Sequence, residues 1–204
     1  MRVRRGAALV ALATGILLVV GASGWAVLAQ APAREASKSI ALDVDPASSK
    51  VHWTLGSTLH AVHGTFAVKG GKITVEPASG KAGGEIVIDA PSGESGNDGR
   101  DKKMHKEIIE SGKYPAISFR PDRVDGSLAS SSAVKAQIHG IFSLHGTEHE
   151  LTVPFEAQLA GDGWKGTAKF TVPYIDWGLK SPSNFFLKAN PTVDVELELA
   201  GKRE

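Results

Sequence analysis

Two histidines and a glutamate in the string HGTEH, residues 145–149, form the pattern in this sequence that is most like a catalytic motif. It matches the H-x-x-E-H pattern of a class of zinc peptidases, whose chemistry needs both histidines on one face of a helix. Here Gly146 and Thr147 lie between two segments with alternating hydrophobic residues, which predicts a β-hairpin instead. His145 and His149 could still face each other across that hairpin, but no third ligand is identifiable. A histidine-metal hydrolase is therefore the less favoured alternative, and no metal site is predicted.

The other five histidines give little support to a metal site. His52, His63 and His139 fall on the polar side of alternating segments, where a solvated imidazole is expected. His60 lies at the end of such a segment, and His105 is predicted on the exposed side of a helix. The chain also has no cysteine, no G-x-S-x-G motif, no phosphate-binding glycine loop and no dinucleotide fingerprint. We therefore expect no catalysis and no cofactor.

The neighbouring Arg100 and Asp101 form a second candidate site. Arg100 could bind the carbonyl or phosphate head of a ligand. Alternatively, the pair could hold the first turn of a helix to a nearby loop, because arginine and carboxylate groups commonly clasp loops together. We favour the structural interpretation of this pair.

Alternating hydrophobic and polar residues predict the elements that position these groups. Each alternating segment follows the previous one closely, which favours antiparallel pairing, and sequences such as KGGK at 69–72 are typical of turns. Many strands that are each apolar on one face must close on themselves or pack as two sheets. We predict an all-β protein with an antiparallel barrel of about eight strands. The segments are 50–56, 61–69, 72–76, 84–90, 115–120, 133–145, 151–159, 164–174 and 192–199.

One short helix is predicted over residues 99–111. Asp98 can cap its start and Gly112 can end it, while a narrow apolar stripe includes Met104 and Ile108. A helix this short needs tertiary contacts to be stable, so we expect it to sit against the barrel. It would serve either as a lid over the mouth or as a plug for the core, and the sequence does not separate these two roles.

The hydrophobic residues of the predicted inward face are the candidate ligand-binding residues. Such a set could line a cavity for an extended apolar chain, or it could simply fill a barrel core. The set comprises Phe66, Ile117, Phe119, Phe142, Leu144, Val153, Phe155, Phe170, Val172 and Tyr174.

Three aromatic residues lie in the segment between two predicted strands near the C-terminus. Trp177, Phe185 and Phe186 place large apolar groups near one end of the barrel. They could close the core, contact a ligand or rest on a membrane surface, and burial is the usual fate of such residues.

The first thirty residues differ from the rest of the chain. Three arginines begin an apolar stretch that ends before Gln30, which predicts for 1–29 a secretory signal peptide or an N-terminal membrane anchor. Residues 30–40 are predicted to be a linker and 41–204 a single barrel domain, exported to the periplasm or anchored facing it. Without 1–29 the chain carries 20 basic and 22 acidic side chains and no basic tract, so nucleic acid is not an expected partner.

Several motifs in order along residues 41–200 resemble the YceI-like family of exported bacterial proteins. They are GRDKKMH, SGKYPAISF, IHGIFSLHGTEHELTVPFEA and VPYIDWG. The resemblance implies a lipocalin-like barrel whose apolar cavity holds a long isoprenoid or quinone-type chain, without catalysis. Family members often carry an arginine before the Asp-aromatic-Gly turn, whereas this chain has an unusually aromatic loop there, so the identity of the ligand does not carry over.

These observations together predict an exported protein that sequesters or carries a long-chain isoprenoid or quinone-type lipid, with possible contact to a membrane surface. The main alternative is an envelope interaction or stress module whose barrel is filled. That alternative predicts a solid interior and an exposed apolar patch at Trp177, Phe185 and Phe186.

Overall fold

A computed structural model describes residues 39–126 and 132–204 of the chain. The predicted export segment and the predicted linker, apart from Ser39 and Ile40, lie outside these residues. No helix in the described part of the chain is long and apolar enough to cross a membrane. The strands are β1 (Ile40–Val44), β2 (Lys50–Leu55), β3 (Val62–Val75), β4 (Ala82–Asp89), β5 (Ala116–Gly126), β6 (Ala133–Leu144), β7 (Thr147–Ala160), β8 (Gly163–Val172) and β9 (Val193–Arg203).

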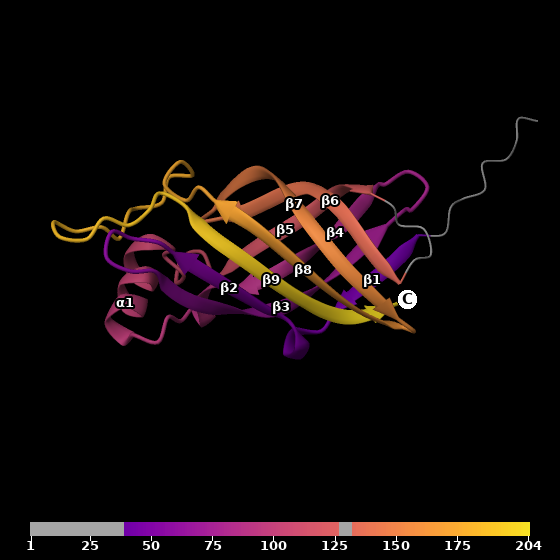
Figure 1. Cartoon of the computed structure of the whole chain (residues 1–204), viewed down its shortest axis with the longest axis horizontal. Helices are drawn as coiled ribbons and strands as arrows, with labels where there is room; N and C mark the ends of the chain where they lie inside the picture. The colour runs from indigo at the N-terminus through magenta and orange to yellow at the C-terminus, as the bar shows by residue number, and fades with distance from the viewer. Residues whose placement is uncertain (1–38, 127–131) are drawn as a thin grey trace, which may run out of the picture. The chain divides into compact units, whose positions relative to one another are not determined.

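The described strands form one closed antiparallel sheet (Figure 1). Each strand from β4 to β9 pairs with its sequence neighbour, and pairing of β3 with both β4 and β2, and of β2 with β9, completes the ring. Strands β1 and β2 share one position: β2 pairs with the first half of β3, and β1 pairs with its second half. The ring therefore has eight positions, which confirms the predicted antiparallel barrel of about eight strands.

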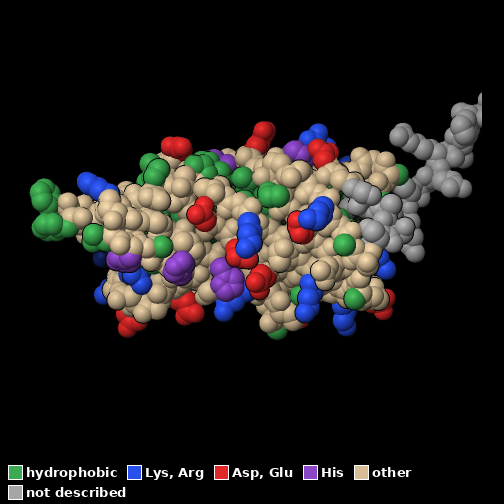
Figure 2. All heavy atoms as spheres, viewed as in Figure 1, with side chains coloured by type: hydrophobic (Ala, Val, Ile, Leu, Met, Phe, Trp, Pro, Cys, Tyr) green, Lys and Arg blue, Asp and Glu red, His purple; other side chains and the backbone are tan. Residues whose placement is uncertain are grey.

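Alternation along each strand decides which side chains enter the barrel. In β8, Trp164, Ala168 and Val172 are buried, whereas Lys165 and Lys169 are exposed. Figure 2 shows charged side chains of both signs scattered over the outer face. Pairs such as Lys169 with Glu196, 2.8 Å apart on neighbouring strands, are solvated and add about 0–1 kcal/mol each.

The structure corrects the prediction of a turn at KGGK. The predicted segments 61–69 and 72–76 do not form two strands. Apart from Ala61 and Glu76 they belong to the single strand β3, which passes through the glycines. Its register against β4 shifts between Val68 and Gly70, and Gly70 has a φ of 130°. Only glycine takes that conformation easily, so the pair of glycines makes a bulge that bends a continuous strand.

The predicted helix is shorter than expected. It consists of α1 (Asp98–Lys103) followed by one turn of π-helix, η3 (Met104–Ile108). Its N-cap is Asn97, not Asp98, because Asn97 Oδ1 accepts a hydrogen bond from Arg100 N at 3.0 Å. The chain leaves the helical conformation at Glu110, whose φ is 44°, before it reaches Gly112.

Register places four connections at one end of the barrel, which we call the mouth end. They are the β2–β3 loop (residues 56–61), the helical segment (residues 90–115), the β6–β7 turn (residues 145–146) and the β8–β9 loop (residues 173–192). The opposite end, which we call the far end, holds the β3–β4 and β7–β8 turns, the start of β1 and the end of β9. Every described strand and its pairing lies within 40–203, inside the compact unit Ala36–Glu204.

Candidate functional site

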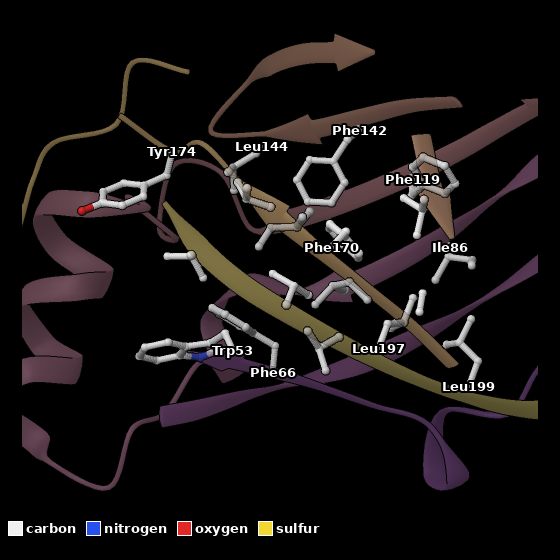
Figure 3. A pocket seen from close by; sticks show the side chains of 18 of the residues that line it. Trp53, Phe66, Ile86, Phe119, Phe142, Leu144, Phe170, Tyr174, Leu197 and Leu199 are labelled. Carbon is white, nitrogen blue, oxygen red and sulfur yellow. The ribbon is translucent and has the colours of Figure 1, made fainter. Parts of the chain in front are cut away.

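The interior of the barrel is hollow. It holds a cavity of about 520 Å³ lined by side chains from all the strands, the β2–β3 loop, the helical segment and the β8–β9 loop (Figure 3). In Figure 3, Phe66, Phe142 and Phe170 point into the same space from β3, β6 and β8. All ten inward residues predicted from the sequence line this cavity: Phe66, Ile117, Phe119, Phe142, Leu144, Val153, Phe155, Phe170, Val172 and Tyr174. Their role in binding a ligand remains a prediction.

Tyr174 reaches the cavity from a different element than expected. Strand β8 ends at Val172, so Tyr174 belongs to the β8–β9 loop and not to the strand. It is buried, and its hydroxyl donates to the carbonyl of Asn190 at 2.8 Å, which holds the two ends of this loop together. Burial raises the pKa of the Tyr174 hydroxyl, so the group stays a neutral donor.

Close contacts between aromatic rings and wall glycines explain why the centre is empty. A Cβ atom on Gly64 would lie 2.2 Å from the ring of Trp53, and one on Gly166 would lie 2.2 Å from the ring of Phe155. Without these Cβ atoms the rings pack directly over the glycine backbone, in space that a side chain would otherwise fill. The hollow interior is thus a property of particular residue pairs, and it contradicts the filled barrel that the alternative function requires.

The lining is almost wholly apolar. Arg203 of β9 lines it at the far end, and the other charged or strongly polar members lie at the mouth end. Ser57 and His60 come from the β2–β3 loop, Arg100 and Lys103 from α1, and Asn184 from the β8–β9 loop. No aspartate or glutamate lines the cavity among the described residues. An extended apolar molecule can be buried here at little cost, because few polar groups of the wall would lose water.

Arg100 and Asp101 both bind Ser95 and do not pair with each other. Arg100 Nε donates to Ser95 Oγ at 2.7 Å, and its Nη2 donates to the Ser95 carbonyl at 3.0 Å. The Asp101 carboxylate accepts from the Ser95 hydroxyl and from its backbone N–H. Burial opposes ionisation of Asp101, but the bonds from Ser95 hold its pKa below the ordinary value. The cluster clasps the helix to the preceding loop; Arg100 also lines the cavity, whereas Asp101 does not.

Other residues of the helical segment contact the cavity or a neighbouring loop. Met104 and Ile108, both predicted at the mouth, line the cavity. Lys103 Nζ donates to the carbonyl of Pro182 at 3.2 Å, which ties α1 to the β8–β9 loop. The sequence predicted an exposed His105, but the structure shows it half-buried. Its ring nitrogens lie 2.9 Å from Ser111 Oγ and 2.7 Å from the Gly93 carbonyl.

A hydrogen bond between Glu110 and His145 joins the helical segment to the β6–β7 turn. The carboxylate lies 2.6 Å from His145 Nε2, and Tyr114 packs against the imidazole at 4.6 Å between ring centroids. Both partners have positive φ, 44° for Glu110 and 54° for His145, and they are the only non-glycine residues in the described chain that do. The bond to His145 lowers the pKa of Glu110, against a smaller effect of burial. Sequence analysis missed this pair, since 35 residues separate its members.

The two histidines of HGTEH point to different partners. His149 stacks on Trp177 with ring centroids 4.1 Å apart, and Trp177 also packs against Phe142 at 5.6 Å. His145 is held by Glu110, so the two histidines do not face each other across the hairpin. No group of three His, Asp or Glu residues in the described part of the chain is arranged to hold a metal ion.

The three loop aromatics have different environments. Trp177 is half-buried and contacts the core, but it does not line the cavity. Phe185 and Phe186 are 89% and 84% exposed, so they neither close the core nor contact the cavity. The usual expectation that such residues are buried is therefore wrong for these two.

Comparisons with known proteins agree with the barrel fold. No curated protein sequence matches the chain. Among solved structures, BcnA of Burkholderia cenocepacia superimposes with a TM-score of 0.63 and 16% identity, over 78% of this chain and 99% of BcnA. A polyisoprenoid-binding domain from Saccharophagus degradans gives 0.60 and 16%, over 80% of this chain and 98% of that domain. At these identities the likeness shows the fold. The sequence profile of the YceI-like domain matches residues 42–200, and the chain therefore belongs to the YceI-like domain family.

Proposed function

We propose that this protein binds a long-chain isoprenoid or quinone-type lipid in the barrel cavity and shields or carries it without chemical change. The hollow apolar interior carries this proposal, because a barrel that served only as a structural module would have no need of a cavity of about 520 Å³. That volume lies within the range of about 300–1,000 Å³ that small-molecule sites occupy. The family and the polyisoprenoid-binding domain of similar fold support the same class of ligand.

Burial of the chain would supply the binding energy. Each methylene moved from water to the cavity contributes about 0.8 kcal/mol, so a tail of ten carbons is held strongly by contact alone. The head of the lipid would stay at the mouth end, where Arg100 and Lys103 line the cavity and no carboxylate does. Such a rim suits an oxygen-rich head, either the carbonyl of a quinone or a phosphate.

The setting we propose for this activity is the bacterial envelope. The basic and apolar segment 1–29 supports export, either as a cleaved signal or as an anchor that faces the periplasm. There the lipid would come from a neighbouring membrane, and the barrel would shield its tail from water.

Native mass spectrometry tests the proposal. The full chain is expressed in bacteria and recovered without detergent, and we expect an extra mass that organic solvent releases as a long-chain lipid. Ala157→Leu, on the inner face of β7, should reduce this occupancy by filling the cavity, whereas Gln158→Leu on the outer face is the matched control. A protein without extra mass that also takes up no added prenyl or quinone lipid would refute the proposal.

A further inference from the structure

The large hydrophobic side chains that the described chain exposes all lie at the mouth end. They are Leu59, 70% exposed in the β2–β3 loop, and Phe185 and Phe186, 89% and 84% exposed in the β8–β9 loop. The loops are joined by a hydrogen bond from Thr58 N to the Lys188 carbonyl at 3.0 Å and by a β-bridge from Ser57 to Ala189. Figure 2 shows the hydrophobic group at the tip of the β8–β9 loop, projecting beyond the barrel at the left. Exposed apolar side chains thus project from two loops that are joined to each other.

Hydrogen bonds hold the tip of the β8–β9 loop in this exposed arrangement. Asn184 Oδ1 accepts from the backbone N–H groups of Phe186 at 3.0 Å and Leu187 at 2.8 Å, and Asn184 N donates to the Leu187 carbonyl at 2.9 Å. The two phenylalanine rings meet edge to face at 5.2 Å. The turn directs Phe185 and Phe186 outward while Leu187 lines the cavity. The exposed surface and the cavity wall are therefore parts of one loop.

Charge around the tip indicates the kind of surface that it fits. Residues 181–187 carry no charge, exposed Lys180 and Lys188 flank them, and 177–193 contain no acidic residue. Apolar groups at a tip with lysines at its base match a bilayer interface, where the rings enter the acyl region and the ammonium groups stay among anionic head groups.

We propose that Leu59, Phe185 and Phe186, with Lys180 and Lys188, dock the mouth end of the barrel on an anionic phospholipid bilayer. This inference rests on the proposed lipid-binding function and names the partner from which the lipid is taken or to which it is given. Docking in this orientation places Ser57, Pro182 and Leu187, which line the cavity, beside the membrane surface. A lipid tail can then pass between bilayer and cavity without crossing open water.

Vesicle co-sedimentation of residues 36–204 tests the docking surface, since this segment contains every described strand and lacks the apolar N-terminal stretch. Vesicles of phosphatidylglycerol with phosphatidylethanolamine serve as the anionic surface, and phosphatidylcholine vesicles as the neutral one. F185S/F186S should bind anionic vesicles at least about tenfold more weakly, because two exposed rings no longer enter the bilayer. The double variant should keep its melting temperature and its uptake of geranylgeraniol, since neither ring lines the cavity.

A second set of variants tests the role of charge. Lys180→Gln and Lys188→Gln should each weaken binding to anionic vesicles by about fivefold and leave binding to neutral vesicles unchanged. Lys165→Gln, an exposed change near the far end of β8, is the matched control and should change neither.

The possible outcomes separate docking from cavity binding. Equal vesicle binding by the wild-type domain and F185S/F186S would overturn the docking surface. It would also be overturned if the wild-type domain bound no vesicles but self-associated, and if F185S/F186S abolished that self-association. Failure of the wild-type domain to take up geranylgeraniol would overturn the proposed lipid cavity. Vesicle binding that is lost in F185S/F186S would still support the docking surface.

Discussion

The two ends of the barrel differ in the length of their connections and in how their side chains pack. At the far end the β7–β8 turn is short, and the buried Trp164 donates to the carbonyls of Asp43 and Lys202 at 3.3 and 3.2 Å. A separate group of buried small side chains, including Val124 and Ala136, packs near this end. Apart from the short β6–β7 turn, the mouth end has long connections held by polar clasps, and it exposes Phe185 and Phe186 to solvent. We therefore expect packing at the far end to contribute more to stability than the contacts at the mouth end.

Replacing one tryptophan at each end gives the largest effect that tests this difference. Trp164→Ala should lower the free energy of unfolding by about 3–5 kcal/mol, since it leaves a cavity at a buried position. Trp177→Ala should lower the free energy of unfolding by roughly half as much, because Trp177 is only half-buried. Urea denaturation of both variants measures the difference. Equal costs would show that the two ends contribute alike to stability.

Replacing Gly166 in the barrel wall tests whether the wall glycines keep the interior open. Gly166→Ala would place a Cβ 2.2 Å from the ring of Phe155, so the ring must tilt into the cavity. We expect a cost of about 1–3 kcal/mol in stability and a reduced capacity for isoprenoid, measured by titration with geranylgeraniol. Thr167→Ala, at the next and outward-facing position, should leave both quantities nearly unchanged. Full ligand capacity in Gly166→Ala would contradict our explanation of the hollow core.

A change at the mouth should affect kinetics more than stability. Lys103→Met removes the hydrogen bond to the Pro182 carbonyl, at a cost of about 0.5–1.5 kcal/mol. Because this bond ties α1 to the β8–β9 loop, release of a bound lipid to acceptor vesicles should become faster. Stopped-flow transfer measures the rate, with Lys102→Met at an exposed position of the same helix as the control. An unchanged release rate would indicate that the two elements do not open apart.

The smallest expected effect is a pH dependence at the Glu110–His145 pair. The bond from His145 lowers the pKa of Glu110 in the folded protein, with help from Lys113 and Lys180 and against burial. A lowered folded-state pKa stabilises the fold above the ordinary value near 4.5, and this contribution disappears as the pH falls through the lowered value. The melting temperature of Glu110→Gln should therefore lie below that of wild type at pH 6 and converge with it in acid. A gap that widens on acidification would show the opposite sign.

Local patterns were sufficient to predict the inner face of the barrel. In β8 the alternation of Trp164, Ala168 and Val172 with two lysines identified the inward side without knowledge of any neighbour. The period of two is a property of the extended backbone itself, so it is visible in the sequence. The KGGK prediction failed for a related reason: glycines that signal a turn also permit a bulge, and pairing with β4 decided between them.

The sequence by itself determined that this chain forms an antiparallel barrel, which side chains face inward and that it resembles the YceI-like family. Only the tertiary structure decided that the interior is hollow, because the space left by Trp53 on Gly64 and Phe155 on Gly166 depends on contacts across strands. It also decided that Phe185 and Phe186 are exposed, which follows from the turn that Asn184 stabilises. Period and composition report on one strand at a time, whereas cavities, clasps and docking surfaces arise where distant segments meet.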